Sequence, residues 1–151
     1  ITYDPLVPPA PDGVFAADVL WFDAFTTNPD RTARNANMLE WHGRIWLIDH
    51  GAALFFHHDW ADVLPRAKDP FGRVAQHVLL PFADDVRAAD ERARARLSRS
   101  VFASILAAVP DSWLEEGYRD EAPAAIRDHY LEYLVTRLEG SAAFVEEAAG
   151  G

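Results

Sequence analysis

Three side chains with oxygen ligand atoms lie within twenty residues of one another. Asp30 and Asn35 are separated by four residues in the polar segment NPDRTARN, and Asp49 follows fourteen residues later in LIDHG. Carboxylate and amide oxygens suit Mg²⁺, and a positioned carboxylate can accept the proton of a hydroxyl group. Together these groups could hold a metal ion against phosphates and prepare a hydroxyl group for phosphoryl transfer.

A helix is predicted directly before the polar segment. Residues 13–27 carry apolar side chains at helical spacing, and Asn28-Pro29 should end the helix, because the residue before a proline is disfavoured in the α region. Residues 28–37 are polar and predict a loop. The apolar helix would then anchor the loop that carries the first two candidate residues.

Two short strands are predicted between this loop and Asp49. The segments NMLEW (37–41) and RIWLID (44–49) flank His42-Gly43, a pattern typical of a β-hairpin. A hairpin returns the chain to its starting point, so the three candidate side chains should become neighbours. Both faces of the second strand are largely apolar, which predicts that helices cover the hairpin.

The order of these residues is the one that kinases use, D-x-x-x-x-N followed by a metal-binding Asp at the end of a strand. Asp30 to Asn35 matches the first part, and Asp49-His50-Gly51 matches the second, with His in place of the usual Phe. On these residues the chain resembles the C-terminal lobe of HipA-like kinases, which typically show N-x-D-x-H-x-K-N. It is more distantly similar to phosphatidylinositol 3/4-kinases, which show D-R-H-x-x-N and then I-D-F-G.

The resemblance covers roughly residues 20–56 and implies both a fold and a set of roles. The implied fold is mainly α with a small β-hairpin, as in the C-terminal lobe of a protein-kinase-like fold. Asp30 would be the catalytic acidic residue, and Asn35 and Asp49 would bind the metal. ATP with Mg²⁺ (or Mn²⁺) would donate the phosphoryl group to a protein Ser/Thr, a lipid head group or a small alcohol.

The two arginines of the loop have two interpretations each. Arg31 and Arg34 are either solvated charges or contacts for a phosphate or an activating group. Arg34 stands where the HipA-like pattern has Lys, and Thr32 stands where that pattern often has His.

The remainder of the chain predicts helices and one kinase-like unit. Apolar periodicity indicates helices at 83–97, at 99–109, from PDSWLEE (110–116) and at 122–140. Residues 1–12 contain four prolines and predict an extended arm, so that residues 13–151 would form the kinase-like C-lobe.

The parts that clamp a nucleotide in kinases are not found in the sequence. Kinases contact the phosphates with a lysine under a Gly-rich loop, both in an N-terminal lobe. The only lysine here is Lys68, after the motif, and no Gly-rich loop precedes residue 28. We therefore expect that this chain lacks the N-lobe. The N-lobe would come from a removed segment of the same protein or from a partner chain in trans, and the chain alone would be inactive.

Composition restricts the class of partner. Fourteen basic and 24 acidic residues give a net charge of −10, which disfavours a nucleic-acid surface. The chain has no cysteine, so thiol chemistry and disulfides are excluded. No apolar run approaches the roughly 18 residues of a membrane span, and no signal peptide is visible, so we expect a cytoplasmic protein.

The sequence is also compatible with two functions other than that of an active kinase. His57, His58 and Asp59 in FFHHDW could bind a transition metal and serve a metal-dependent phosphohydrolase. The second alternative is a non-catalytic, pseudokinase-type binding module with the same fold.

Overall fold

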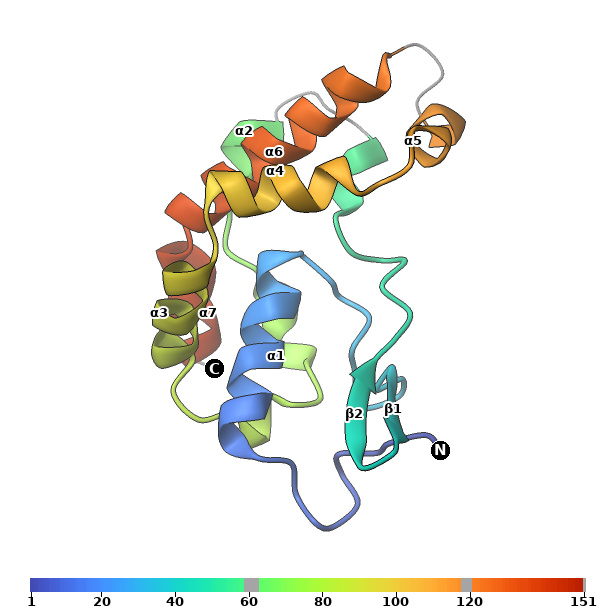
Figure 1. Ribbon diagram of the computed structural model, residues 1–151. Helices are drawn as coiled ribbons and strands as arrows, with labels where there is room; N and C mark the ends of the chain where they lie inside the picture. Colours follow the sequence, from blue (N-terminus) through green and yellow to red (C-terminus); the bar gives the residue numbers. More distant parts are fainter. Residues whose placement is uncertain (59–62, 118–120, 151) are drawn as a thin grey trace.

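Helix α1 (Gly13–Phe25) lies at the centre of the computed structural model, and the other elements are arranged around it (Figure 1). Three stretches of the chain are described, residues 1–58, 63–117 and 121–150. They are mainly helical with one two-stranded antiparallel sheet, which confirms the mainly α class with a small hairpin. No helix within these stretches is long and apolar enough to cross a membrane.

The elements after α1 are two strands, three short 3₁₀ helices and six further helices in the described part of the chain. In chain order they are β1 (Met38–Trp41), β2 (Arg44–Leu47), η1 (Phe55–His58), α2 (Val63–Arg66), η2 (Gly72–Gln76), η3 (Leu80–Phe82), α3 (Val86–Arg96), α4 (Arg99–Ala107), α5 (Asp111–Gly117), α6 (Pro123–Glu139) and α7 (Ala142–Ala149). The five predicted helices are confirmed as α1, α3, α4, α5 and α6, whereas α7 was not predicted.

Helix α1 is held by specific contacts at both ends. The Asp12 carboxylate accepts a hydrogen bond from the Phe15 backbone N–H (2.9 Å) at its start. At its end Thr27 adopts a left-handed φ of 55°, and the Asn28 and Thr27 N–H groups donate to the carbonyls of Asp23 (2.8 Å) and Ala24 (3.3 Å). This is a Schellman motif, which satisfies the last helical carbonyls and turns the chain sharply into the loop.

The hairpin is confirmed, but its predicted covering is only half right. Met38 pairs with Leu47 and Trp41 with Arg44, and His42 and Gly43 both have positive φ, as a two-residue hairpin turn requires. Met38 is buried against α1. The expectation that helices cover both faces is wrong, because Trp41 and Trp46 are 60% and 48% exposed.

The N-terminal arm continues the sheet instead of hanging free. The Tyr3 N–H donates to the Met38 carbonyl (3.0 Å), and the Glu40 N–H donates to the Ile1 carbonyl (2.8 Å). The first residues of the arm therefore lie along β1 and fix the outer edge of the hairpin.

Aromatic side chains form the main core between α1 and the C-terminal helices. Trp21 stacks on Phe25 with ring centroids 5.0 Å apart, and Phe25 stacks on Phe102 of α4 at 5.8 Å. Phe144 of α7 meets the Trp21 ring edge-on at 5.9 Å. Burial of these large rings is the principal stabilisation of the packing of α4 and α7 around α1.

A buried arginine joins α6 to the end of α1. Arg137 is 1% exposed, and its guanidinium donates to the carbonyls of Ala24 (2.7 Å), Phe25 (3.2 Å), Ala67 (3.0 Å) and Asp69 (2.7 Å). The positive charge also suits the C-terminal end of the α1 dipole. One side chain thus bonds carbonyls from two segments. The Ala24 carbonyl also accepts the Thr27 N–H, whereas the carbonyls of Phe25, Ala67 and Asp69 accept no other hydrogen bond among the described residues.

We predict that Arg137→Met lowers the free energy of unfolding by at least about 3 kcal/mol, because several buried carbonyls lose their donors. Arg137→Lys should recover only part of this loss, since an ammonium group lacks the planar fork of donors. Urea unfolding followed by circular dichroism measures both variants. The exposed Arg96→Met is the matched control and should stay within about 0.5 kcal/mol of the wild type; an equally small effect of Arg137→Met would refute the role given to Arg137.

Candidate functional site

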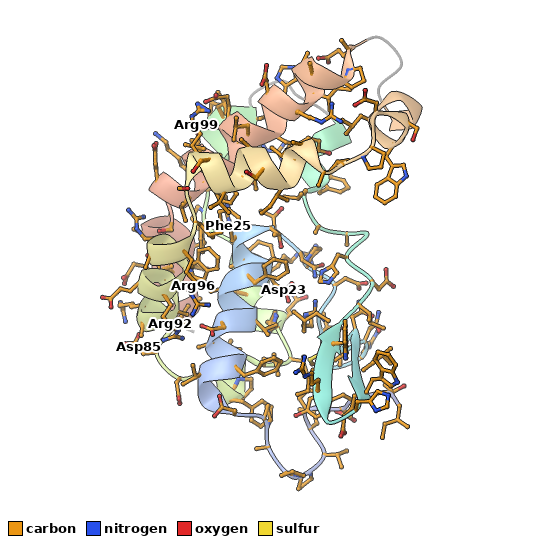
Figure 2. The ribbon with its side chains drawn as sticks, viewed as in Figure 1. Asp23, Phe25, Asp85, Arg92, Arg96 and Arg99 are labelled. Atoms are coloured by element: carbon orange, nitrogen blue, oxygen red, sulfur yellow. The ribbon has the colours of Figure 1, made fainter. Side chains whose placement is uncertain are left out.

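A buried ion pair fixes the 28–37 loop to α1. Asp23 is fully buried on the side of α1 toward the hairpin (Figure 2), and the Arg31 Nε donates to its Oδ2 at 2.5 Å. The Nη1 atom of the same arginine donates to the carbonyls of Ala36 (3.1 Å) and Asn37 (2.6 Å). Arg31 therefore connects the helix to the far end of the loop.

Two more side chains complete the shell around Asp23. The Asn28 amide donates to Oδ1 at 3.0 Å, and His77 Nε2 lies 2.9 Å from Oδ2. His77 Nδ1 accepts the Leu79 backbone N–H (3.1 Å), so the ring proton is on Nε2 and is donated to Asp23. The carboxylate thus receives hydrogen bonds from an amide, an imidazole and a guanidinium, as a buried charge requires.

The expectation for Arg31 is corrected by this arrangement. Its side chain is fully buried, so it is not a solvated loop charge, and its guanidinium faces Asp23 and the loop carbonyls instead of a surface where phosphate could bind. Arg34 is exposed at the tip of the loop and keeps both of its predicted interpretations.

Asp30 is held through one of its two carboxylate oxygens. Asn37 Nδ2 lies 3.2 Å from Oδ2, and Asn35 Nδ2 lies 3.5 Å from the same atom. The Asp30 backbone is also fixed, because its N–H donates to Asn28 Oδ1 (3.2 Å) and its carbonyl accepts from Asn37 Nδ2 (3.3 Å). The predicted proximity of Asp30 and Asn35 is therefore present in the fold.

Asn35 occupies one end of a tight turn at the tip of the loop. Its N–H donates to the Thr32 carbonyl and its carbonyl accepts from the Thr32 N–H, both at 3.0 Å. The Val78 N–H donates to the Arg31 carbonyl (3.0 Å), so the turn rests on the 77–78 segment. Because the Asn35 Nδ2 faces Asp30, its Oδ1 is the side-chain atom suited to a cation.

Asp49 follows β2 and is joined to the loop through the backbone. The N–H of the preceding residue, Ile48, donates to the Asn37 carbonyl at 3.0 Å. Asp49 is exposed and has a left-handed φ of 54°, a conformation that Asp and Asn tolerate better than other side chains with a Cβ. No direct hydrogen bond joins its carboxylate to Asp30 or Asn35 in the described part of the chain.

Asn37 is the member of the site that sequence reasoning missed. It contacts the Asp30 carboxylate with its side chain, Arg31 with its carbonyl, and Ile48 through that same carbonyl. It also has a left-handed φ of 49°. An asparagine between a polar loop and a strand was the only available signal, because asparagine is enriched at such backbone positions.

The described residues give no support to the alternative of a metal-dependent phosphohydrolase that uses His57, His58 and Asp59. His57 and His58 belong to η1, but their side chains and Asp59 lie outside what the structure describes. His50 meets the Phe22 ring edge-on at 5.8 Å, and His42 contacts Trp41. Across the described residues, no group of three His, Asp or Glu side chains could hold a metal ion.

Lys68 lies beside the junction of α6 and α7. Its side chain lies next to Gly140, where a Cβ would come within 3.2 Å of the Lys68 Cγ, at the junction of α6 and α7. Among the described residues, this only lysine of the chain makes no hydrogen bond or ion pair with Asp30, Asn35 or Asp49.

The pKa of Asp23 gives a pH-dependent test of the buried network. Burial alone would raise this pKa, but the hydrogen bonds from His77 and Arg31, the Arg31 charge and the Asn28 amide more than offset burial and lower it. The folded state therefore holds the proton less tightly than the unfolded state. The resulting stabilisation is present above the unfolded pKa of about 3.9 and is lost as pH falls through the lowered folded pKa.

We predict that Asp23→Asn lowers the free energy of unfolding at pH 7 by about 3–5 kcal/mol, since Arg31 remains buried without its counter-charge. The variant should also lose part of the decrease in stability that the wild type shows on acidification below about pH 4. Denaturant titrations between pH 2.5 and pH 7 would measure both effects. Asp18→Asn is the control, because its exposed ion pair with Arg92 should contribute less than about 1 kcal/mol.

The 28–37 loop and the segment that follows β2 together carry the four polar residues of the candidate site. Asp30 contacts both Asn35 and Asn37, and Ile48, the residue before Asp49, is joined to the same loop by one backbone hydrogen bond. Comparisons of the chain with models of protein families, with curated proteins and with solved structures gave no match.

Proposed function

We propose that this chain carries the catalytic aspartate and the metal ligands of an ATP-dependent phosphotransferase with a HipA-like C-lobe. The observation that supports this most directly is the Asp30 carboxylate, held through Oδ2 by two asparagine amides on a loop that is anchored in the core. The phosphoryl acceptor in this proposal is a hydroxyl group, on a protein Ser/Thr, a lipid or a small alcohol.

Asp30 has the geometry of a group that positions an acceptor hydroxyl. Its Oδ2 accepts from Asn35 and Asn37, so Oδ1 is the oxygen left to accept a hydrogen bond from the hydroxyl. These hydrogen bonds favour one orientation of the carboxylate. A positioned base contributes both orientation of the nucleophile and removal of its proton.

Asn35 and Asp49 supply hard oxygen atoms at the edge of the same loop. The Asn35 Oδ1 and the Asp49 carboxylate suit Mg²⁺ or Mn²⁺ better than Zn²⁺, which prefers nitrogen and sulfur. When bound with ATP, the metal ion would neutralise charge on the phosphates. The left-handed backbone of Asp49 fits this role, since unusual backbone conformations concentrate at functional positions.

The clamp on the nucleotide would come from outside residues 1–151 in this proposal. Lys68 lies next to Gly140, and among the described residues it makes no hydrogen bond or ion pair with Asp30, Asn35 or Asp49. The chain alone should therefore bind the metal weakly, because phosphate oxygens normally complete the coordination shell.

We predict that Mn²⁺ broadens the backbone NMR signals of residues around Asn35 and Asp49 in a saturable manner at millimolar concentration. Asp49→Asn should weaken this effect about tenfold by removing one ligand charge, and it should not disturb the fold, because asparagine tolerates the left-handed backbone. Glu40→Gln, an equal change of charge at an exposed residue of β1, is the matched control and should leave the effect unchanged. Broadening centred on η1 instead would favour the histidine-based hydrolase.

A preparation that combines this chain with its nucleotide-clamping lobe tests the role of Asp30. Asp30→Asn should lower phosphoryl transfer by about 10²–10⁴-fold, with ATP affinity unchanged, because the base acts on the acceptor and the clamp holds the phosphates. Transfer of radiolabelled phosphate and ATP titration would separate the two effects. Strong ATP hydrolysis by residues 1–151 alone, unaffected by Asp30→Asn, would show that the assigned residues are wrong.

A further inference from the structure

A pocket of about 370 Å³ adjoins the loop on the side of α2 and α6. Thr27 and Pro29 line it, which places its wall one residue before Asp30. Neither Asn35 nor Asp49 is among its described lining residues, so it is separate from the candidate metal ligands. Its volume is within the range of small-molecule sites, about 300–1,000 Å³.

Aromatic rings form the apolar part of this pocket. Phe56 stacks on Tyr133 with centroids 3.6 Å apart, and Phe71 lines the same space. Burial raises the pKa of Tyr133, and the opposing effects of Arg137 and a hydrogen bond to Thr27 do not cancel that shift. Phe56, Phe71 and Tyr133 are 5%, 8% and 2% exposed, so together they form a nearly buried apolar wall of the pocket.

The charge of the lining is opposite to that of the chain. Three arginines and one aspartate line the pocket (Arg66, Arg73, Arg137 and Asp69), a formal charge of +2, whereas the whole chain has −10. Such a reversal in a concave site attracts anions.

Two of these arginines are available to a ligand. Arg137 is already bonded to backbone carbonyls, and Asp69 acts electrostatically on that guanidinium. Arg66 and Arg73 are exposed, and across the described residues no carboxylate lies within ion-pair distance of either. Guanidinium groups bind phosphate and carboxylate through paired hydrogen bonds.

We propose that this pocket binds the phosphoryl acceptor as a small anionic molecule that carries a hydroxyl group, with its phosphate or carboxylate on Arg66 and Arg73 and its apolar part against Phe71 and Tyr133. The assignment of the ligand as acceptor rests on the proposed phosphotransferase function. Anion binding by the pocket does not, because it uses neither Asp30 nor the metal ligands.

Isothermal titration of residues 1–151 with phenyl phosphate, benzoate and benzyl alcohol tests the pocket. Phenyl phosphate or benzoate should bind saturably, and the neutral alcohol should bind at least about tenfold more weakly, because it lacks charge-assisted hydrogen bonds. The tighter of the two anions identifies the acidic group that the arginines prefer. Asp30→Asn should leave this affinity unchanged, so the pocket can be supported even where the catalytic assignment fails.

The double variant Arg66→Gln/Arg73→Gln should weaken binding of the tighter anion at least about tenfold. Both residues are exposed, so the fold should be retained, and circular dichroism verifies this. The matched control Arg44→Gln/Arg96→Gln removes two exposed arginines, one from β2 and one from α3, where Figure 2 shows Arg96. Neither residue lines the pocket, so the control should leave binding unchanged. Failure of both anions to bind, an unchanged affinity in the Arg66/Arg73 variant, or equal weakening in the control would overturn the proposal.

Discussion

The candidate site depends on the buried pair of Asp23 and Arg31. Two opposite charges in the interior are tolerable only when their remaining donors and acceptors are also satisfied. Here Asn28 and His77 complete the shell of Asp23, and the loop carbonyls of Ala36 and Asn37 complete that of Arg31. The cost of burying the charges therefore forces the loop into one conformation, and that conformation places Asp30 beside two asparagines.

The same constraint explains how rigidity reaches the second half of the site. The Asn37 carbonyl accepts hydrogen bonds from the buried Arg31 and from the Ile48 N–H. The backbone directly before Asp49 is therefore fixed to the interior of the protein. Because the backbone is fixed in this way, the exposed side chains of Asn35 and Asp49 need few contacts to stay in place. A site built in this way can keep free oxygen atoms for a metal ion and an acceptor while its backbone stays in place.

Local patterns in the sequence predicted the elements but not the contacts between distant segments. The spacing of apolar residues located α1, and His42-Gly43 located the hairpin turn, because both signals act over a few residues. Arg31 was misjudged since its partner Asp23 lies inside an apolar helix, where an acid looks like an isolated polar residue. His77 lies 54 residues from Asp23 in the sequence, so only the tertiary fold shows that the two side chains meet. The tertiary fold also decides that no helix covers the face of the hairpin that carries Trp41 and Trp46.

We propose that Asp30, Asn35 and Asp49 form one metal-dependent site for phosphoryl transfer. Crystals of the protein with its nucleotide-clamping lobe, grown with Mn²⁺ and a non-hydrolysable ATP analogue, would test it by anomalous diffraction. We expect a manganese peak at about 2.1–2.3 Å from the Asn35 Oδ1 and an Asp49 carboxylate oxygen, with the terminal phosphate facing Asp30. A peak bound by His57 and His58, or none near Asn35 and Asp49 with the analogue in place, would contradict it.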